Sequence, residues 1–318
     1  MEPGINIIVG SRGSKLALTQ SRTVMDRLQE QVAGLECSLK TIRTQGDKIV
    51  DVALSKIGDK GLFVKEIENA LLDQTIDLAV HSMKDVPTAV PEGLELGAIL
   101  EREDPRDALV CLDAGSLAEL PAGSRVGTGS LRRIAQLSAA YPGLKFEPIR
   151  GNLDTRLRKM ESGEFSALVL AYAGLKRMGW LDHVVDIIEP DVCLPAVGQG
   201  ALGVEIRSGD ERVTGLIAAL DHPATHQCVL AERAFLRHVE GGCQVPVGAL
   251  GTLRGKELTL EGVIASLDGK TLLRDLESGS PEEAQQLGIK LAEKLLARGA
   301  GAVLEEVRRT YEESNGKE

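Results

Sequence analysis

The stretch Ile5-Asn-Ile-Ile-Val-Gly-Ser-Arg-Gly-Ser14 is a short apolar run that stops in glycine and serine. Its first half, Ile5–Val9, predicts a β-strand, and the residues that follow, Lys15–Val32, predict a helix with Ser14 as its N-cap. The next apolar run, Ser38–Thr44, predicts a second strand. Strands that alternate with helices usually pair in parallel, so this opening predicts a doubly wound α/β sheet.

The same alternation begins again after Arg102–Arg106, where Pro105 marks a crossing point. Apolar runs such as Ala108–Leu112 and Ala167–Ala171 predict the strands of a second α/β unit. The run Val197–Ile206 then predicts a strand that returns to the first unit. A chain that crosses twice between two α/β lobes forms a hinged cleft, and we expect the ligand to bind between the lobes.

The last third of the sequence has a different pattern. It predicts a helix over Thr225–Val239 and then three strands, with the hairpin signal Asp268-Gly269 between the last two. Pro281 suits the first turn of a closing helix. We therefore expect three domains: an α/β lobe from residues 1–101 and 197–219, a second α/β lobe from residues 102–196, and a small α+β domain from residues 220–318 with a three-stranded antiparallel sheet.

Composition limits the possible partners of this 318-residue chain. A net charge of −10 and an aromatic content of 3% make nucleic acid an improbable ligand. No apolar run approaches the roughly 18 residues of a membrane span, and the N-terminus lacks the features of a secretory signal. The five cysteines form no C-x-x-C pair and no even-numbered disulfide framework. We expect a cytoplasmic monomer that binds no metal, no nucleic acid and no membrane.

Arginine residues recur where predicted strands end. Ligands of open α/β sheets bind beyond these ends, where helix N-termini attract anions. Arg132 and Arg133 follow the predicted N-cap Ser130, and a cation in a first turn opposes the helix dipole unless an anion lies beside it. Each arginine alone is best interpreted as a solvated surface charge, but the repetition favours a cleft that binds carboxylates. The arginines concerned are Arg12, Arg132, Arg133, Arg150, Arg156 and Arg177.

A second candidate segment runs from Asp77 to Pro87, where an apolar strand leads into His-Ser-Met-Lys-Asp. If the segment is extended, Lys84 and Asp85 point to opposite faces, and the lysine keeps the neighbouring carboxylate charged. Such a carboxylate suits the stabilisation of a cation. A plain surface turn is an equally good interpretation of this segment alone, and His81 is expected to be a hydrogen-bonded structural histidine.

Cys243 differs from the other cysteines. It follows Gly241 and Gly242, which suit the end of a helix, whereas Cys37, Cys111, Cys193 and Cys228 lie in or beside apolar or helical segments and are expected to be buried and inert. Cys–His catalysis is an alternative for Cys243, although no histidine is nominated as its partner. The segment Gln45–Gly61 is rich in glycine and charge and is expected to be a mobile loop over the cleft.

Several motifs together resemble the porphobilinogen deaminase (hydroxymethylbilane synthase) family, and they cover essentially the whole chain in order. They are Gly10-Ser-Arg-Gly-Ser14, Gln45-Gly-Asp47, Lys60-Gly-Leu-Phe63, Val80-His-Ser-Met-Lys-Asp-Val-Pro87, Gly127-Thr-Gly-Ser-Leu-Arg-Arg133, Arg150-Gly-Asn152, Leu194-Pro-Ala-Val-Gly-Gln-Gly-Ala201 and Gly241-Gly-Cys-Gln-Val-Pro246. The resemblance implies two periplasmic-binding-protein-like lobes around a cleft, with a third domain that carries the cysteine.

The resemblance also implies the reaction. Porphobilinogen, an aminomethyl pyrrole with acetate and propionate side chains, loses ammonia and is joined head to tail into the linear tetrapyrrole hydroxymethylbilane. The primer is a dipyrromethane cofactor, which the resemblance places on Cys243 through a thioether. A two-lobed anion-binding receptor that performs no chemistry is the alternative, since fold alone does not decide function.

The resemblance assigns roles to individual residues as well. Asp85 is the expected catalytic carboxylate, and Phe63 is expected to close over the cleft with Lys56. The expected cofactor-binding residues besides Cys243 are Lys84, Thr128, Ser130, Arg132, Arg133 and Arg156. The expected substrate-binding residues are Arg12, Ser14, Phe63, Arg150, Arg156, Arg177 and Gln199.

Overall fold

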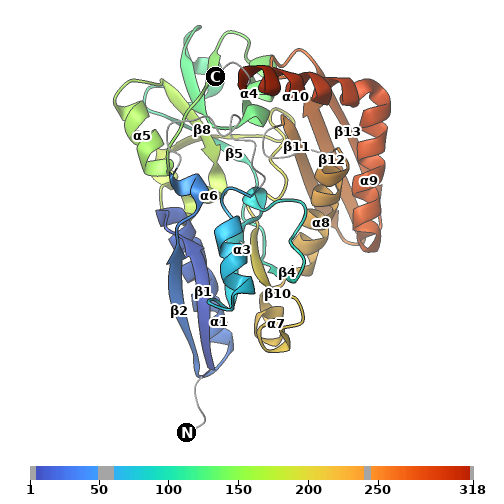
Figure 1. Cartoon of the computed structure of the whole chain (residues 1–318). Helices are drawn as coiled ribbons and strands as arrows, with labels where there is room; N and C mark the ends of the chain where they lie inside the picture. Colours follow the sequence, from blue (N-terminus) through green and yellow to red (C-terminus); the bar gives the residue numbers. More distant parts are fainter. Residues whose placement is uncertain (1–4, 49–60, 240–244, 316–318) are drawn as a thin grey trace. The chain divides into compact units, whose positions relative to one another are not determined.

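The computed structural model describes residues 5–48, 61–239 and 245–315 (Figure 1). They divide into two compact units. Among the described residues, unit 1 comprises residues 5–48, 61–103 and 200–226, and unit 2 comprises residues 104–199, 227–239 and 245–315. The chain therefore leaves unit 1 before Asp104 and returns to it at Gly200.

Unit 1 contains a five-stranded sheet in the order β2-β1-β3-β10-β4. Strand β1 pairs in parallel with β2 and β3, whereas β10 is antiparallel to both β3 and β4. The strands are β1 (Ile5–Arg12), β2 (Leu35–Ile42), β3 (Leu78–Ser82), β4 (Leu94–Ile99) and β10 (Leu202–Arg207). The helices are α1 (Lys15–Gln31), α2 (Gln45–Lys48), α3 (Lys65–Leu72) and α7 (Glu211–Ile217), with short 3-10 turns η2 (Met83–Asp85) and η5 (Ala218–Leu220).

Alternation along the strands of unit 1 gives its sheet two buried faces. On one face Ile7 and Val9 of β1 pack with Val204 and Ile206 of β10 against α1 and α7. On the other face Ala79 of β3 packs against apolar residues of α3. A sheet covered on both sides is typical of α/β proteins, and it leaves the strand ends as the places where polar side chains collect.

Unit 2 contains a second five-stranded sheet, in the order β7-β6-β8-β5-β9. Strand β6 is parallel to β7 and β8, and β5 is antiparallel to β8 and β9. The strands are β5 (Asp107–Cys111), β6 (Arg125–Thr128), β7 (Lys145–Pro148), β8 (Ala167–Ala171) and β9 (Val184–Ile188). The helices are α4 (Leu131–Ala140), α5 (Leu153–Glu161) and α6 (Tyr172–Arg177), with 3-10 turns η3 (Leu117–Glu119) and η4 (Leu181–His183).

The two sheets share one topology, and both contain antiparallel pairs beside the parallel pairs that the sequence pattern predicted. In each sheet the fourth strand is antiparallel to its neighbours, and in each it is the strand that the chain enters after crossing between units. A crossover helix fixes the direction of a strand that follows within the same unit. No such helix precedes β10 or β5 within its unit, so the prediction of parallel pairing was wrong for these two strands.

The C-terminal part of unit 2 is a three-stranded antiparallel sheet, β11-β12-β13, packed against helices. The large side chain of Phe235 is fully buried in this core. The strands are β11 (Val247–Arg254), β12 (Glu257–Ala265) and β13 (Leu272–Gly279). The helical segments are α8 (Pro223–His238), η6 (Pro281–Glu283), α9 (Ala284–Leu295), the π-helical η7 (Leu296–Ala300) and α10 (Gly301–Asn315).

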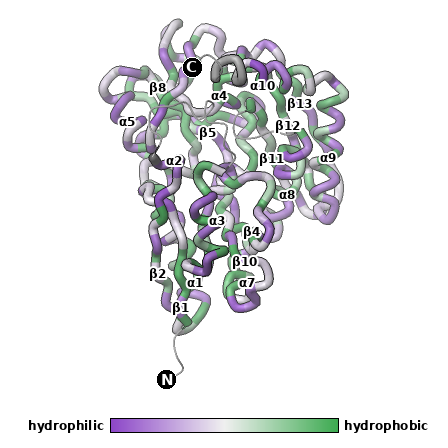
Figure 2. The backbone as a smooth tube through the Cα atoms, in the orientation of Figure 1, coloured by the Kyte–Doolittle hydropathy of each residue, from purple (hydrophilic) through white to green (hydrophobic). Residues whose placement is uncertain are grey.

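The expected fold class, two α/β lobes and a small α+β part with a three-stranded antiparallel sheet, is confirmed. In Figure 2 hydrophobic residues follow the strands of the sheets, and hydrophilic residues recur along the helices that cover them. The predicted hairpin at Asp268-Gly269 is also confirmed, and Gly269 has the positive φ of 71° that such a turn needs. The boundary expected between a second and a third domain stays a prediction, because both parts lie in unit 2.

Candidate functional site

The turn that carries Asp85 is held in place by Met83, which is buried and hydrogen-bonded through its backbone. Strand β3 ends at Ser82, and the next three residues form the 3-10 turn η2 instead of continuing extended. The Met83 N–H donates to the carbonyl oxygen of Ala201 (3.1 Å), and the Met83 side chain is only 1% exposed. A Cβ atom at Gly203 would lie 2.3 Å from Met83 Sδ, so Met83 occupies space that only a glycine leaves open. Lys84 and Asp85 are half-buried, and among the described residues the Asp85 carboxylate has no hydrogen-bonding partner.

A buried titratable cluster lies one turn before Asp85. His81 Nε2 is 3.0 Å from Glu205 Oε2, and both side chains are nearly inaccessible to solvent. His81 is thus a hydrogen-bonded histidine, as expected. Glu68 of α3 is also buried, and burial together with the charge of Glu205 raises its pKa to about 7, although His81 and Lys65 act in the opposite direction. Sequence reasoning did not find Glu68 or Glu205.

Arg12 lies at the end of β1, as predicted, but it has a partner within the chain. Its Nη2 atom is 2.5 Å from Asp47 Oδ1, and its guanidinium lies 4.1 Å from the ring centroid of Phe63. Burial pushes the pKa of Asp47 up, but hydrogen bonds from Arg12 and Thr44 outweigh burial and hold that pKa below its usual value. Ser14 is the N-cap of α1, as predicted, because its Oγ accepts a hydrogen bond from the Ala17 N–H (3.2 Å).

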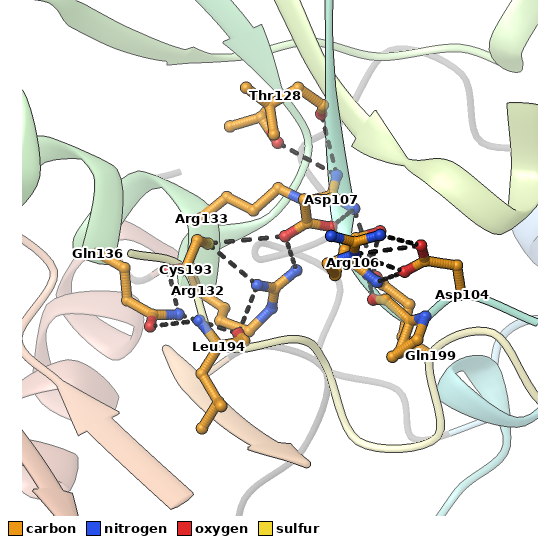
Figure 3. A network of polar contacts seen from close by, with 12 residues as sticks. Asp104, Arg106, Asp107, Thr128, Arg132, Arg133, Gln136, Cys193, Leu194 and Gln199 are labelled. Atoms are coloured by element: carbon orange, nitrogen blue, oxygen red, sulfur yellow. Dashed lines mark hydrogen bonds and ion pairs between the residues drawn. The ribbon is translucent and has the colours of Figure 1, made fainter. Parts of the chain in front are cut away.

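A network of polar contacts lies in unit 2 around Asp107 (Figure 3). Arg132 Nη2 is 2.8 Å from Asp107 Oδ2, and Arg133 Nη2 is 2.8 Å from Asp107 Oδ1. The Asp107 side chain is 0% exposed, and those of the two arginines are 3% and 5% exposed. Burial alone would raise the pKa of Asp107, but the two guanidinium groups outweigh it and hold that pKa far below its usual range.

The anion that the first-turn arginines require is therefore, in part, a residue of the chain itself. Sequence reasoning missed Asp107, although one signal was present: an aspartate opens the apolar run Ala108–Cys111 directly after the crossing segment. Two further predicted residues join the network. Gln199 Nε2 donates to Asp107 Oδ1 (2.8 Å), and Arg133 Nη1 donates to Thr128 Oγ1 (3.4 Å).

The cluster has more positive than negative charge. It contains two guanidinium groups and one carboxylate. The second acidic group is the thiol of Cys193, whose pKa is raised to about 12 by burial. Among the described residues the Nε–H groups of Arg132 and Arg133 are buried and lack acceptors, as does Nη2 of Arg150. Buried donors are rarely left without partners, so this set fits a ligand that brings carboxylate oxygens.

The remaining predicted site residues lie on or beside helices of unit 2. Arg156 donates from Nε to the carbonyl oxygen of Gly151 (2.8 Å), and a Cβ atom at Gly129 would lie 3.3 Å from its Nη2, which places it beside the turn before α4. Ser130 is the N-cap of α4, as predicted, but its side chain makes no capping hydrogen bond. Arg177 lies in the last turn of α6 and not at a strand end, and a cation is favoured there by the helix dipole.

The cysteines differ in part from expectation. Cys111, Cys193 and Cys228 are buried, but Cys37 on the outer strand β2 is half-exposed. Cys193 is not inert packing, because its Sγ accepts a hydrogen bond from Arg132 Nη1 (3.2 Å). Cys243 and Lys56 lie outside the described residues, as does most of the expected loop over Gln45–Gly61.

The described residues contain no group of three or more His, Cys, Asp or Glu side chains arranged to hold a metal ion. No helix among them is long and apolar enough to cross a membrane.

The fold and the site together define a class of protein: an α/β protein suited to bind a polycarboxylate ligand. The features that define it are arginines at strand ends in two α/β units, buried guanidinium donors that lack acceptors among the described residues, and a carboxylate on a fixed turn. Comparison with known proteins identifies the family within this class. Residues 7–215 match the family model for porphobilinogen deaminase, dipyromethane cofactor binding domain, and residues 226–297 match that for its C-terminal domain. The chain belongs to the porphobilinogen deaminase family.

Individual relatives agree with this assignment. The chain is 57% identical to porphobilinogen deaminase of Moorella thermoacetica over 304 residues, which cover 96% of this chain and 97% of the relative. It is 52% identical to that of Carboxydothermus hydrogenoformans over 307 residues, with 96% and 99% covered. The predicted family, its transferase activity in porphyrin biosynthesis and its dipyrromethane cofactor are thereby confirmed, and the alternative of a receptor without catalysis is not supported.

The similarity to solved structures is weaker than the similarity to these sequences. The crystal structure of the methionine binding protein MetQ matches 68% of this chain and 89% of its own, with 13% identity and a TM-score of 0.44. At that level no functional inference follows.

Proposed function

We propose that this chain deaminates porphobilinogen and joins it head to tail into hydroxymethylbilane, with Asp85 as the catalytic carboxylate and the described arginines as the groups that bind substrate and cofactor carboxylates. The observation that carries the proposal is the Asp107 cluster. Its two buried arginines have one internal carboxylate between them and two N–H donors without acceptors. Each pyrrole of this pathway brings an acetate and a propionate, which are acceptors of the required kind.

The residues present fit a dipyrromethane. Arg132 and Arg133 would bind its carboxylates through their open Nε–H groups, with Lys84, Thr128, Ser130 and Arg156 as further donors, and Cys243 would hold it through a thioether. When bound, the dipyrromethane supplies the pyrrole to which each new unit is joined. The hydroxyl of Ser130 makes no helix-capping hydrogen bond, which supports its assignment to a ligand.

Asp85 would stabilise positive charge on the substrate. Loss of ammonia from porphobilinogen leaves a cationic azafulvene, and the pyrrole nitrogen of that cation is an N–H donor. A carboxylate held on a rigid turn can accept this hydrogen bond and offset the charge without reorganising. The turn η2 is rigid at its inner end, because Met83 is buried and its N–H is bonded to Ala201.

The incoming substrate would be held by Arg12, Ser14, Phe63, Arg150, Arg177 and Gln199. Arg150 supports this assignment best. Burial lowers its pKa, and one of its buried Nη atoms has no acceptor among the described residues. Arg12 is paired with Asp47, so a substrate carboxylate would share its guanidinium with that residue. Gln199 is bonded to Asp107 and to the carbonyl oxygen of Pro105, and would act by holding the arginine cluster.

The decisive test replaces Asp85 by asparagine, which keeps the shape of the side chain and removes its charge. We expect Asp85→Asn to fold and to bind porphobilinogen, but to lose turnover by about 10²–10³-fold or more, because one preorganised electrostatic contact is typically worth that much. Release of ammonia and formation of hydroxymethylbilane are measured together. Asp113→Asn, in an exposed turn, is the control and should keep full activity. Turnover of Asp85→Asn within a few-fold of the unmodified chain would remove Asp85 from this role.

We also infer a monomer in a reducing compartment such as the cytoplasm. The four described cysteines are free thiols, which supports a reducing environment. Sedimentation equilibrium at several protein concentrations tests the oligomeric state, and a concentration-dependent mass would contradict the monomer.

A further inference from the structure

We infer that Asp107 is a positioning residue for the proposed reaction: its carboxylate holds the guanidinium groups of Arg132 and Arg133 in a fixed, buried pair before any ligand carboxylate binds. The inference rests on the proposed function, since it concerns how the cofactor-binding arginines are prepared. Asp107 does not itself contact substrate or cofactor in this proposal.

The backbone of Asp107 is well fixed. It is the first residue of β5 and is paired on both sides, with Ala171 of β8 and Ile188 of β9. The two carboxylate oxygens are divided between the two arginines, at 2.8 Å each (Figure 3). A side chain held by two neighbouring strands is a more rigid support than one carried on a loop.

Each arginine is also bound at a second point. Arg132 Nη1 donates to the carbonyl oxygen of Leu194 (2.7 Å), and Arg133 Nη1 donates to that of Val169 (3.0 Å). A planar guanidinium bound through both of its Nη atoms cannot rotate, so the direction of its Nε–H is fixed. The Nε–H groups are the two donors that lack acceptors among the described residues.

The charge of Asp107 is needed as well as its shape. Two like charges placed side by side in a buried region repel each other unless an anion lies between them. Asparagine has one acceptor oxygen, and its amide N–H groups would face the N–H groups of the other arginine, donor against donor. Cys193 cannot replace the anion, because its thiol stays protonated at neutral pH. With Asp107 the pair retains one positive charge, which a ligand carboxylate can neutralise.

The test uses the full chain with three substitutions at one position. Asp107→Asn keeps the volume and removes the charge, Asp107→Ala leaves a hole of carboxylate size, and Asp107→Glu keeps the charge. Asp104→Asn is the matched control: Asp104 lies three residues earlier and is also bound to an arginine, with Arg106 Nη2 at 2.7 Å from its Oδ2. Intact mass reports the attached cofactor, and kcat and KM for porphobilinogen are measured separately.

We expect Asp107→Asn and Asp107→Ala to be isolated with less attached cofactor and to lose about 100-fold in kcat/KM, the effect of a misplaced binding group. Sodium formate should restore part of the activity of Asp107→Ala, while formamide, of similar shape but neutral, and sodium chloride at equal ionic strength should not. The same comparison is repeated as a melting temperature in a Cys243→Ser background, which lacks the cofactor under the proposed function; intact mass verifies this before melting. Formate should raise the melting temperature of Asp107→Ala there and leave that of the Asp107 parent unchanged.

The outcomes separate this inference from the proposed function. If the unmodified chain makes no hydroxymethylbilane, the proposed function fails. If it does, and Asp107→Asn matches it in cofactor content and kcat/KM, the positioning role is wrong. Rescue by formamide as good as by formate would likewise overturn it, since shape alone would then suffice. If the Asn and Ala variants are insoluble even in formate, Asp107→Glu decides: retention of attached cofactor supports a charge that holds the arginines, and its loss contradicts it.

Discussion

At the scale of single residues, several buried ionisable side chains of the described residues lie in groups. Arg132 and Arg133 share Asp107 in unit 2, and Glu68, His81 and Glu205 lie together in unit 1. The arginines could be predicted because a cation in a first helical turn conflicts with the helix dipole, and that conflict is visible in the sequence. Their partner could not, because Asp107 lies 25 residues away from Arg132 on a strand, and pairing at that separation depends on the sheet order.

The raised pKa of Glu68 gives a prediction for stability against pH. Its folded-state pKa of about 7 lies above the ordinary value of 4.5, so its contribution to stability is fully present below the ordinary pKa and is lost as pH rises through 7. We expect Glu68→Gln, which cannot ionise, to melt a few degrees above the unmodified chain at pH 8, and to lose this advantage at pH 5. A domain of this size shifts by roughly 2–4 °C for each kcal/mol.

Melting curves between pH 5 and pH 8 check this expectation. Glu95→Gln is the control, because Glu95 is exposed on β4 of the same unit and should shift equally little at every pH. A constant difference between Glu68→Gln and the unmodified chain across this range would show that Glu68 does not titrate there.

At the scale of elements, the segment from β3 to Asp85 shows what periodicity predicts and where it stops. The apolar run Leu78–Val80 predicted the strand, and the structure confirms it over Leu78–Ser82. The 3-10 turn that follows was not predicted, because it depends on a glycine that is distant in sequence. Gly203 on the neighbouring strand β10 leaves the space that Met83 fills, and it lies opposite His81 in the antiparallel pairing.

This contact predicts that Gly203→Ala displaces the turn that carries Asp85. The added Cβ would lie 2.3 Å from Met83 Sδ, so the buried Met83 side chain must move. We expect kcat to fall about tenfold to a hundredfold, since small displacements of a catalytic group are costly. Gly215→Ala is the control, because nothing lies within 4 Å of a Cβ atom at Gly215 in helix α7, and alanine favours a helix.

A double variant that removes the clash distinguishes displacement of the turn from a general loss of stability. Gly203→Ala combined with Met83→Ala removes the clash and should recover part of the lost kcat, even though the melting temperature falls further because a buried side chain is shortened. A double variant no more active than Gly203→Ala would argue against the proposed link between this contact and Asp85.

At the scale of the whole molecule, the same topology occurs in two units. The sequence pattern predicted a crossing near Arg102–Arg106 and a return with the strand at Val197–Ile206, and the chain changes unit at Asp104 and Gly200 and once more at Gln227. Local apolar patterns were sufficient for this, because each strand–helix alternation is encoded over a few tens of residues. The direction of β5 and β10 was not predictable in the same way, since each is entered from the other unit and no local crossover helix sets its direction. Of the candidate site, sequence alone supplied the cations and Asp85, while the internal anions Asp47 and Asp107 emerged only from the folded chain.

Attachment of the cofactor should also change the stability of the whole chain. A dipyrromethane joined to Cys243 would bring carboxylates to arginines that carry an excess positive charge. These contacts exist only in the folded state, so they stabilise it. We expect Cys243→Ser to be isolated without the added mass, to be inactive and to melt at a lower temperature than the unmodified chain. Cys37→Ser, which changes a half-exposed thiol on β2, should keep the mass, the activity and the melting temperature. Added mass on Cys243→Ser would place the attachment at another residue. If the added mass is lost but the melting temperature is unchanged, the cofactor does not stabilise the chain through the charge of the arginine cluster.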